Sequence, residues 1–269
     1  MIVDAFPFFN ELDLLEIRLN ELYETVDKFI LIESTRTLSN KPKSLYFNEN
    51  KLRFSRFLDK IDHIIINDEL IKNLEWVSDR FTIDWYQKNY PLFHLRNYPD
   101  DTILCFSDLD EIVKAKCINN YNKNRGVGTF LLSNRCYYMN MIFNKCYYQP
   151  LKKAKISTLG WIRNSGKTLL EIRETISDYL IEDSGWHFSY LGGSEKIIEK
   201  IESFAHQEYN KEEIKDRKKI EYLISIGKDI YGRNYTYSVI PIDKNYPKFV
   251  LENFSLFLSK KYFLDEKQN

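Results

Sequence analysis

Four short apolar runs, each followed closely by an acidic residue, constrain the fold of this chain more than any other feature. The runs occupy residues 2–3, 28–32, 61–66 and 102–106, and stretches of helical or loop character separate them. Strands joined by such crossovers form a mostly parallel, doubly wound α/β sheet. Because the carboxyl ends of parallel strands meet at one edge, the acids that follow should gather there. These acids are Asp4, Glu33, Asp68 and Asp108.

The clearest strand exit is the segment TILCFSDLDEI at residues 102–112. Its apolar half suits a strand buried on both faces, and Asp108, Asp110 and Glu111 follow at once. Carboxylates in an Asp-x-Asp arrangement supply oxygen ligands to a hard divalent cation, which predicts a site for a metal and a nucleotide diphosphate. A polar turn whose aspartates cap the next helix is the alternative, and the motif alone leaves both open.

Helical periodicity and turn residues place the other expected elements. Apolar residues at spacings of three and four predict a helix over residues 12–26, with Asn10 as its N-cap and an aromatic turn over residues 6–9 before it. Gly192 and Gly193 predict a turn that makes Ser194 an N-cap. Further helices are expected over 211–225 and 248–263 and within 76–97, and further strands within 129–140, 146–149 and 155–158.

Composition narrows the classes of partner. Lys plus Arg and Asp plus Glu each number 39, so no global field draws the chain to nucleic acid or to an anionic membrane. Aromatic residues make up 15% and often stand beside Asn, which suits carbohydrate binding, although a codon bias towards Asn, Lys, Ile and Tyr gives the same result. The four cysteines form no C-x-x-C pair, so we expect reduced thiols.

Targeting signals are not recognisable in the sequence. Residues 1–9 have no basic region followed by a long apolar run, and no window reaches about 18 apolar residues. We therefore expect a cytoplasmic protein without a membrane span, or one whose targeting segment was removed. The sequence does not predict an oligomeric state.

Five segments together resemble glycosyltransferase family 17. They are DAFPFFNELDLLEIRL (4–19), FILIESTRTLSNKPK (29–43), FSDLDEI (106–112), GWHFSY (185–190) and the segment 246–262. The similarity therefore covers nearly the whole chain. Two positions depart from the family pattern, because Asn40 stands where a glycine is expected and Val113 where a proline usually follows Asp-Glu-Ile.

The resemblance implies a single GT-A-like domain over residues 1–269. It would have a nucleotide-sugar-binding half (1–115) and an acceptor half with C-terminal helices (116–269). It also implies a UDP-sugar donor, with N-acetylglucosamine as the expected sugar, a carbohydrate acceptor, a divalent metal (Mn²⁺, with Mg²⁺ as the alternative) and inversion at the anomeric carbon. We expect no membrane anchor like that of the animal enzymes, and this expectation argues against an N-glycan acceptor more than against the chemistry.

Site roles follow from the same resemblance. Asp110 and Asp108 are expected to hold the metal, with Asp108 also available to the ribose, and Glu111 to orient them or to form a structural salt bridge. His187, within Gly-Trp-His-x-Ser, is expected to complete the metal sphere or to contact the donor, whereas a buried structural histidine is the alternative. The general base is expected to be Glu195, in the first turn of a helix after a glycine-rich bend.

Other residues have weaker assignments. Glu208 and Asp183 are the reserve candidates for the base, and His206 is a minor metal candidate. Asp4 and Glu33 are expected to accept hydrogen bonds from the uridine or ribose. Arg80, Arg18 and Lys43 can pair with phosphate or with the acids of the sheet edge. For Arg18, a salt bridge on the helix surface is the favoured interpretation.

Two other functional classes stay open at this stage. A metal-dependent nucleotidyl- or phosphoryl-transfer enzyme also presents paired aspartates at a strand end. A non-catalytic carbohydrate-binding protein would keep the aromatic residues and need no metal.

Overall fold

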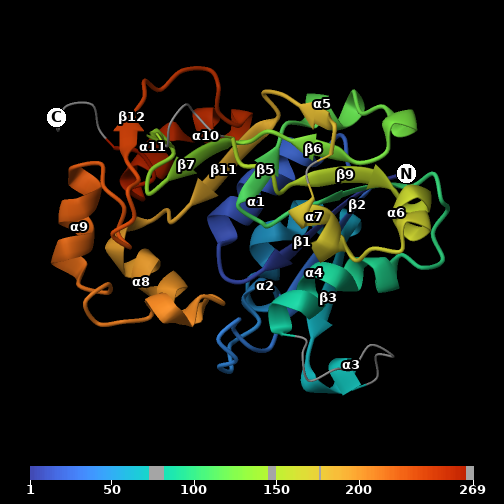
Figure 1. The fold of residues 1–269 in the computed structure, drawn as a ribbon, viewed down its shortest axis with the longest axis horizontal. Helices are drawn as coiled ribbons and strands as arrows, with labels where there is room; N and C mark the ends of the chain where they lie inside the picture. Colours follow the sequence, from blue (N-terminus) through green and yellow to red (C-terminus); the bar gives the residue numbers. More distant parts are fainter. Residues whose placement is uncertain (73–81, 145–149, 176, 265–269) are drawn as a thin grey trace. The chain divides into compact units, whose positions relative to one another are not determined.

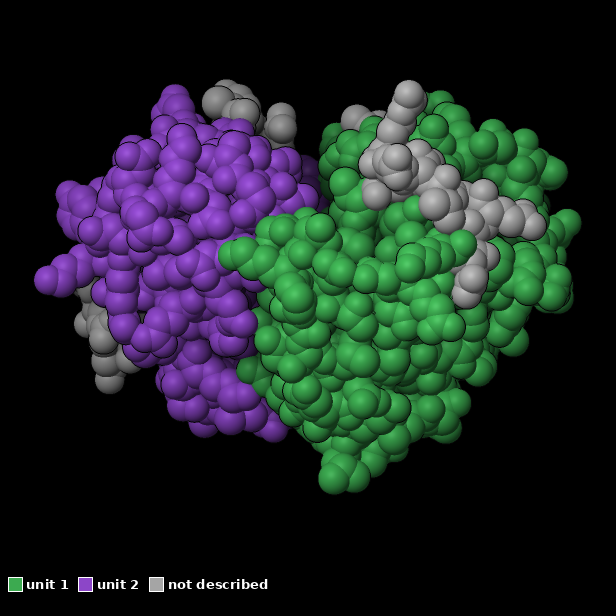
Figure 2. Space-filling view, turned by 90° about the horizontal axis from the view of Figure 1, so that it is seen from below, with its two compact units in different colours: residues 1–132, 152–185 green, residues 133–151, 186–269 purple. Residues whose placement is uncertain are grey.

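The computed structural model describes residues 1–72, 82–144, 150–175 and 177–264 (Figure 1). The chain divides into two compact units, which Figure 2 distinguishes by colour. Unit 1 comprises residues 1–132 and 152–185, and unit 2 comprises residues 133–151 and 186–269. Each unit is built from two separate segments, so this division differs in kind from the predicted halves 1–115 and 116–269. The predicted halves stay a prediction.

Unit 1 contains most of the strands of the molecule. Its strands are β1 (Ile2–Phe8), β2 (Lys28–Ser34), β3 (Ile61–Ile66), β4 (Ile103–Phe106), β5 (Glu111–Val113), β6 (Gly128–Phe130), β9 (Lys155–Thr158) and β10 (Tyr179–Ile181). Its helices are α1 (Leu12–Leu22), α2 (Tyr46–Glu49), α3 (Asp68–Lys72), α4 (Ile83–His94), α5 (Ala115–Asn119), α6 (Leu159–Ser165) and α7 (Leu169–Glu174), with 3-10 helices at Lys51–Lys60 and Lys123–Arg125.

Seven of the described strands of unit 1 form one sheet in the order β10-β6-β9-β4-β1-β2-β3. The pairs β2·β3, β1·β2, β1·β4 and β6·β10 are parallel, whereas β9 runs antiparallel to β4 and β6. A mixed α/β fold with a mostly parallel sheet is therefore confirmed.

Helices cover both faces of this sheet. Alternate side chains of a strand point to opposite faces, and one face presents Val3, Ala5, Ile30, Leu104 and Phe106 to an apolar cluster. That cluster is completed by side chains of α4, α6 and α7, and Figure 1 shows α4 and α7 beside β1. Helix α1 lies on the opposite face, where its Arg18 bonds to Asp4 of β1.

The first strand is longer than the sequence suggested. It continues through the aromatic segment to Phe8, so the predicted turn over residues 6–9 is wrong, and Asp4 lies in the strand interior opposite Phe29 and Cys105. Phe6 and Phe8 are almost fully buried, and this burial favours continued pairing with β2. The expected gathering of strand-end acids therefore does not include Asp4.

Unit 2 is the smaller of the two units. Its strands are β7 (Ser133–Cys136), β8 (Met141–Phe143), β11 (Gly185–Ser189, whose first residue belongs to unit 1) and β12 (Tyr237–Val239), and within the described part of unit 2 they follow the order β12-β8-β7-β11. Its helices are α8 (Gly193–Ser203), α9 (Arg217–Ser225), α10 (Lys248–Glu252) and α11 (Phe254–Ser259), with a 3-10 helix at Gln207–Tyr209. Helices α8 and α9 share an apolar cluster with β7 and β8.

Several predicted helix ends differ from those in the structure. Helix α1 has Glu11, not Asn10, as its N-cap, and no side chain caps it. Helix α9 begins only after Asp216, whose carboxylate accepts from the Lys219 N–H. The predicted helix over 248–263 is two short helices that meet at Asn253, where φ is −116° and ψ is 30°.

Two observations concern the cysteines and the membrane. Cys105, Cys117 and Cys136 are buried free thiols, in agreement with the expectation of reduced cysteines, while Cys146 and the strand predicted over 146–149 lie outside the described residues. Among the described residues, no helix combines the length and apolar character needed to cross a membrane.

Candidate functional site

A buried arginine fixes the backbone of the acidic motif in unit 1. The Arg18 side chain is completely buried and donates to both carboxylate oxygens of Asp4 at 2.8 and 2.6 Å. It also donates to Ser107 Oγ at 2.7 Å and to the carbonyl oxygens of Asp108 and Glu111 at 2.8 and 3.1 Å. The turn after β4 is thus held through its carbonyl groups, and its aspartate carboxylates are not needed for this anchoring.

A second arginine engages the carboxylates themselves. Arg173 of α7 donates to Asp108 Oδ2 at 2.8 Å and to both carboxylate oxygens of Glu111 at 2.9 and 3.2 Å. Glu111 Oε2 also accepts from the Asp108 N–H at 2.9 Å. Burial opposes the charge of Arg173, yet the neighbouring Asp108 and Glu111 carboxylates outweigh this effect and raise its pKa above the ordinary value. Glu111 therefore positions Asp108 and Arg173.

A lysine adds a further positive charge at this strand exit. Lys88 of α4 lies 2.9 Å from an Asp84 oxygen and 3.6 Å from Asp108 Oδ1. Burial lowers the pKa of Lys88, but Asp108 and Asp84 together raise it above the ordinary value. Lys88, Arg173 and Asp108 border a cavity of about 10 Å³, room for no more than one water molecule. A larger ligand would reach Asp108 from the solvent side, where 35% of its side chain is exposed.

The donor set at the motif fits a hard divalent cation. Asp108 and Asp110 offer carboxylate oxygens, the ligands that Mg²⁺ and Mn²⁺ prefer, and Asp110 retains 8% exposure. Among the described residues, no three His, Cys, Asp or Glu side chains converge as a complete metal cage. A cation held here would therefore complete its sphere with water and substrate phosphate oxygens, as Mg²⁺ commonly does.

The acids predicted to contact uridine or ribose lie inside unit 1. Asp4 and Glu33 are both fully buried. Asp4 is paired with Arg18, while Glu33 accepts from Lys43 Nζ at 3.2 Å and from the Phe47 N–H at 3.3 Å. Neither carboxylate reaches the surface, because these partners enclose it.

The remaining predicted residues are distributed over both units. Asp183, in unit 1, pairs with Lys114 and Lys116, and Arg80 lies outside the described residues. In unit 2, His187 Nδ1 lies 2.9 Å from Asn134 Oδ1, and the exposed Glu208 pairs with the exposed His206.

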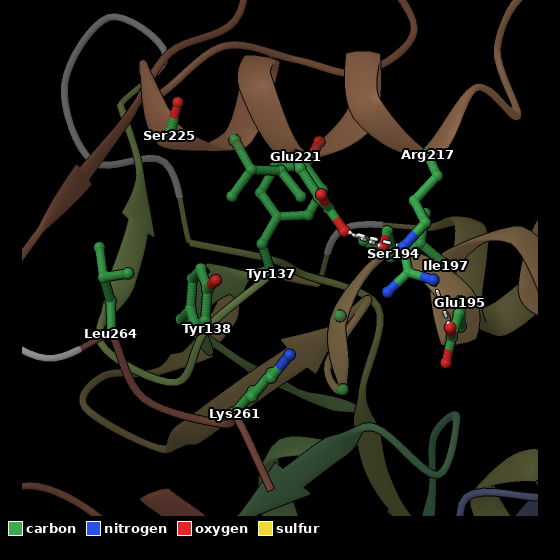
Figure 3. Close-up of a pocket in the computed structure, with 13 residues that line it drawn as sticks. Tyr137, Tyr138, Ser194, Glu195, Ile197, Arg217, Glu221, Ser225, Lys261 and Leu264 are labelled. Carbon is green, nitrogen blue, oxygen red and sulfur yellow. Dashed lines mark hydrogen bonds and ion pairs between the residues drawn. The ribbon is translucent and has the colours of Figure 1, made fainter.

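Glu195 lies at the rim of a pocket in unit 2. Gly192 and Gly193 have φ values of 92° and 83°, which glycine adopts without strain, and they turn the chain into α8. Glu195 is in the first turn of this helix, as predicted, and its carboxylate accepts from Arg217 at 2.6 Å (Figure 3). Ser194 was predicted to be the N-cap of α8, but Gly192 holds that position. The Ser194 hydroxyl donates to Glu221 of α9 instead.

Sequence reasoning misjudged Arg18 and missed two cations of the site. The favoured surface salt bridge for Arg18 is wrong, since its side chain is buried against Asp4. Its position offered a signal, because it lies three residues after Leu15 and four before Leu22 on the buried side of the helix. Lys88 and Arg173 had no comparable signal, since each lies in an ordinary charged helix far along the chain from Asp108.

Comparison with known families decides the classification. The family model for glycosyltransferase family 17 matches residues 1–248. The chain belongs to glycosyltransferase family 17. It is accordingly a glycosyltransferase, and the resemblance noted from its motifs is confirmed. No curated protein matches this glycosyltransferase. Among solved structures, it is similar to the inositol-1-phosphate CTP transferase from T. maritima, with a TM-score of 0.33, 10% identity and 94% of each chain covered. A likeness this weak carries no argument about function.

Proposed function

We propose that this family 17 member is a metal-dependent, inverting glycosyltransferase with a GT-A fold. It would transfer N-acetylglucosamine from a UDP-sugar to a carbohydrate hydroxyl. The observation that carries this proposal is the acidic turn after β4, whose backbone is fixed by the buried Arg18. A turn held through its carbonyl groups keeps its backbone in place when Asp108 and Asp110 bind a ligand.

The chemistry requires neutralisation of the departing diphosphate. Asp108 and Asp110 would hold the divalent cation, which supplies Lewis-acid stabilisation of that leaving group when bound. Arg173 and Lys88 place two more positive charges beside Asp108. Both can stabilise negative charge on phosphate oxygens through charge-assisted hydrogen bonds. Glu111 keeps Arg173 and the Asp108 N–H in place.

The acceptor hydroxyl requires a base. We assign this role to Glu195, because its carboxylate is exposed at the start of α8 on the rim of a pocket. Arg217 orients the carboxylate through the 2.6 Å contact. Proton removal by a positioned carboxylate contributes roughly 10²–10⁴-fold to such reactions. His187 remains a proposed ligand of the donor or the metal.

A screen of UDP- and GDP-sugars tests the proposal. Each sugar nucleotide is incubated with the protein, with and without Mn²⁺, and release of the nucleoside diphosphate is measured. We expect Mn²⁺-dependent release of UDP from UDP-N-acetylglucosamine, and loss of at least about 10³-fold in Asp110→Asn with the thermal midpoint unchanged. Undiminished release by Asp110→Asn would remove Asp110 from the site, and transfer of nucleotidyl or phosphoryl groups alone would reject the proposed donor chemistry.

Two glutamate variants test the assignment of Glu195 as the general base. Glu195→Gln is expected to lower turnover by about 10²-fold or more with little change in UDP affinity, because it removes the base and leaves donor contacts intact. Glu208→Gln is the matched variant, since Glu208 is also an exposed glutamate in unit 2. Loss of turnover in Glu208→Gln and not in Glu195→Gln would transfer the role to Glu208.

A further inference from the structure

Unit 2 contains a pocket that the donor chemistry of unit 1 does not use. Its volume is about 280 Å³, near the lower end of the ~300–1,000 Å³ found for small-molecule sites. Side chains of α8, α9, the loop after β7 and the C-terminal segment line it (Figure 3). All of the described lining residues belong to unit 2, so the pocket can be considered within this unit. It has room for one sugar ring and little more.

The charged groups around the pocket cancel. Arg217 and Lys261 supply two positive charges, and Glu195 and Glu221 supply two negative charges. Arg217 pairs with both glutamates, at 2.6 Å to Glu195 and 3.1 Å to Glu221. The hydrogen bond from Ser194 and the charge of Arg217 lower the pKa of Glu221, which keeps it ionised at neutral pH. A charged ligand would have to displace one of these ion pairs or leave a charge in the pocket without a partner.

These groups offer donors and acceptors side by side. The Glu221 carboxylate accepts from the Ser194 hydroxyl at 2.7 Å and from Arg217 Nε. More than half of the Glu221 side chain is still exposed, so it can accept from a ligand as well. Figure 3 shows Lys261 extending towards the same space from the opposite side. Alternating donors and acceptors of this kind match hydroxyl groups, each of which donates one hydrogen bond and accepts others.

An aromatic ring completes the lining. Tyr138 is half-buried against the apolar cluster of unit 2, and its ring forms part of the pocket wall (Figure 3). Burial and the charge of Glu221 raise the pKa of Tyr138, so its hydroxyl stays protonated and can donate. Ile197 and Leu264 add apolar surface. The C–H face of a sugar requires such apolar surface next to polar groups.

We propose that this pocket binds one neutral sugar residue of the acceptor. The bound sugar is identified as an acceptor on the basis of the proposed function, whereas sugar binding itself stands on the pocket. Tyr138 contacts the ring face of the sugar, and Glu221 accepts from its hydroxyl groups. Glu195, on the rim of the same pocket, is then close to the bound sugar. The acceptor class is therefore a neutral glycan, not a glycan with a carboxylate or phosphate at this position.

Ligand-observed saturation-transfer NMR on the full chain tests the pocket without requiring turnover. The probes are methyl α-mannoside, methyl β-glucoside, methyl β-galactoside and methyl N-acetyl-β-glucosaminide, at concentrations up to about 20 mM. We expect at least one of them to bind. Tyr138→Ala should weaken that binding by about tenfold, and Tyr138→Phe, which keeps the ring, by no more than about threefold. Glu221→Gln, at an exposed position, should weaken it by about fivefold because a charge-assisted acceptor is lost.

Anionic probes test the alternative that the pocket binds a charged ligand. Glucuronate and glucose 6-phosphate should bind no better than the neutral glycosides, because the charges around the pocket cancel. The proposal is overturned if none of the four glycosides binds, if only the anionic probes bind, or if Tyr138→Ala and Glu221→Gln both bind like the unmodified protein. UDP-sugar hydrolysis is measured in parallel. Hydrolysis without sugar binding rejects the pocket alone, and sugar binding without hydrolysis rejects the donor chemistry alone.

Discussion

The acidic turn of unit 1 and the pocket of unit 2 hold their carboxylates in opposite ways. In unit 1, Arg18 and Asp4 are paired with 0% of either side chain exposed, and Arg173 pairs with Glu111 with 6% and 3% exposed. In unit 2, the pair of Arg217 and Glu195 is 56% and 75% exposed. A buried pair is costly to break because one charge is left without a partner, whereas an exposed pair is solvated and screened.

This difference suits two different tasks. A site that binds diphosphate and a metal gains from a fixed array of charges, because no reorganisation is needed when charge develops. A pocket that binds sugar hydroxyls gains from side chains such as Glu221, which can exchange a protein partner or water for the ligand. The comparison teaches that the ion pairs around the acidic turn of unit 1 serve its structure, whereas those at the pocket of unit 2 stay accessible to a ligand.

Replacement of Arg18 is expected to have the largest effect on stability, and it tests whether the buried ion pair of unit 1 is structural. Arg18→Met should lower the free energy of unfolding by about 3–5 kcal/mol, because it leaves Asp4 as an unpaired buried charge and removes the donor to two carbonyl groups. Urea denaturation measures this change.

The matched control for this experiment is Arg53→Met in the same unit. Arg53 pairs with Asp13 and Glu16 at a partly exposed position, and its loss should cost no more than about 1 kcal/mol. Equal destabilisation by the two substitutions would contradict a structural role for the buried pair.

The buried Lys155 gives unit 1 a pH dependence. Its ammonium donates to Thr129 Oγ1 at 3.0 Å and to the Lys152 carbonyl at 2.8 Å. Burial, reinforced by the charge of Arg173, lowers its pKa from 10.5 to about 8. Between pH 8 and 10.5 the unfolded chain therefore binds more protons at this residue, so stability attributable to Lys155 rises with pH.

Lys155→Met isolates this contribution from other groups that titrate in the same range. The unfolding free energy of the unmodified protein relative to Lys155→Met should rise by on the order of 2 kcal/mol from pH 8 to pH 10. Urea titrations at a series of pH values measure the difference. A difference that stays constant over this range would show that Lys155 keeps an ordinary pKa in the folded protein.

The smallest effect is expected in unit 2. Arg217→Met removes an exposed guanidinium from Glu195 and Glu221, so the urea midpoint should stay within experimental error of the unmodified value. The same variant should weaken sugar binding, because it removes a group that orients Glu221. A clear loss of stability would erase the proposed contrast between the two units.

The sequence predicted the backbone of the proposed donor site better than its side-chain environment. The strands over 28–32, 61–66 and 102–106 were expected because continuous β-branched and aromatic runs favour buried strands, and the structure has β2, β3 and β4 there. The exit that carries Asp108 and Asp110 followed from the same pattern. Asp4 was misplaced because the aromatic segment after it was interpreted as a turn.

The partners of the acids depend on tertiary packing and could not be predicted in this way. Arg173 lies 65 residues after Asp108, and only the packing of α7 and β4 in unit 1 brings the two together. In the same way, Ser194 satisfied every local rule for an N-cap, yet its hydroxyl donates to Glu221, 27 residues away. Pairs between residues distant in sequence therefore decide the side-chain partners at the acidic turn of unit 1 and at the pocket of unit 2.

The most direct test of the central claim is the dependence of UDP binding on metal. Calorimetric titration of UDP into the protein, with and without Mn²⁺, should show affinity at least about tenfold higher with the metal, because in the proposed site Asp108 and Asp110 hold a cation whose coordination sphere the diphosphate completes. In Asp110→Asn the two affinities should be equal. UDP binding that is independent of Mn²⁺ in the unmodified protein, or metal dependence that survives in Asp110→Asn, would contradict the account.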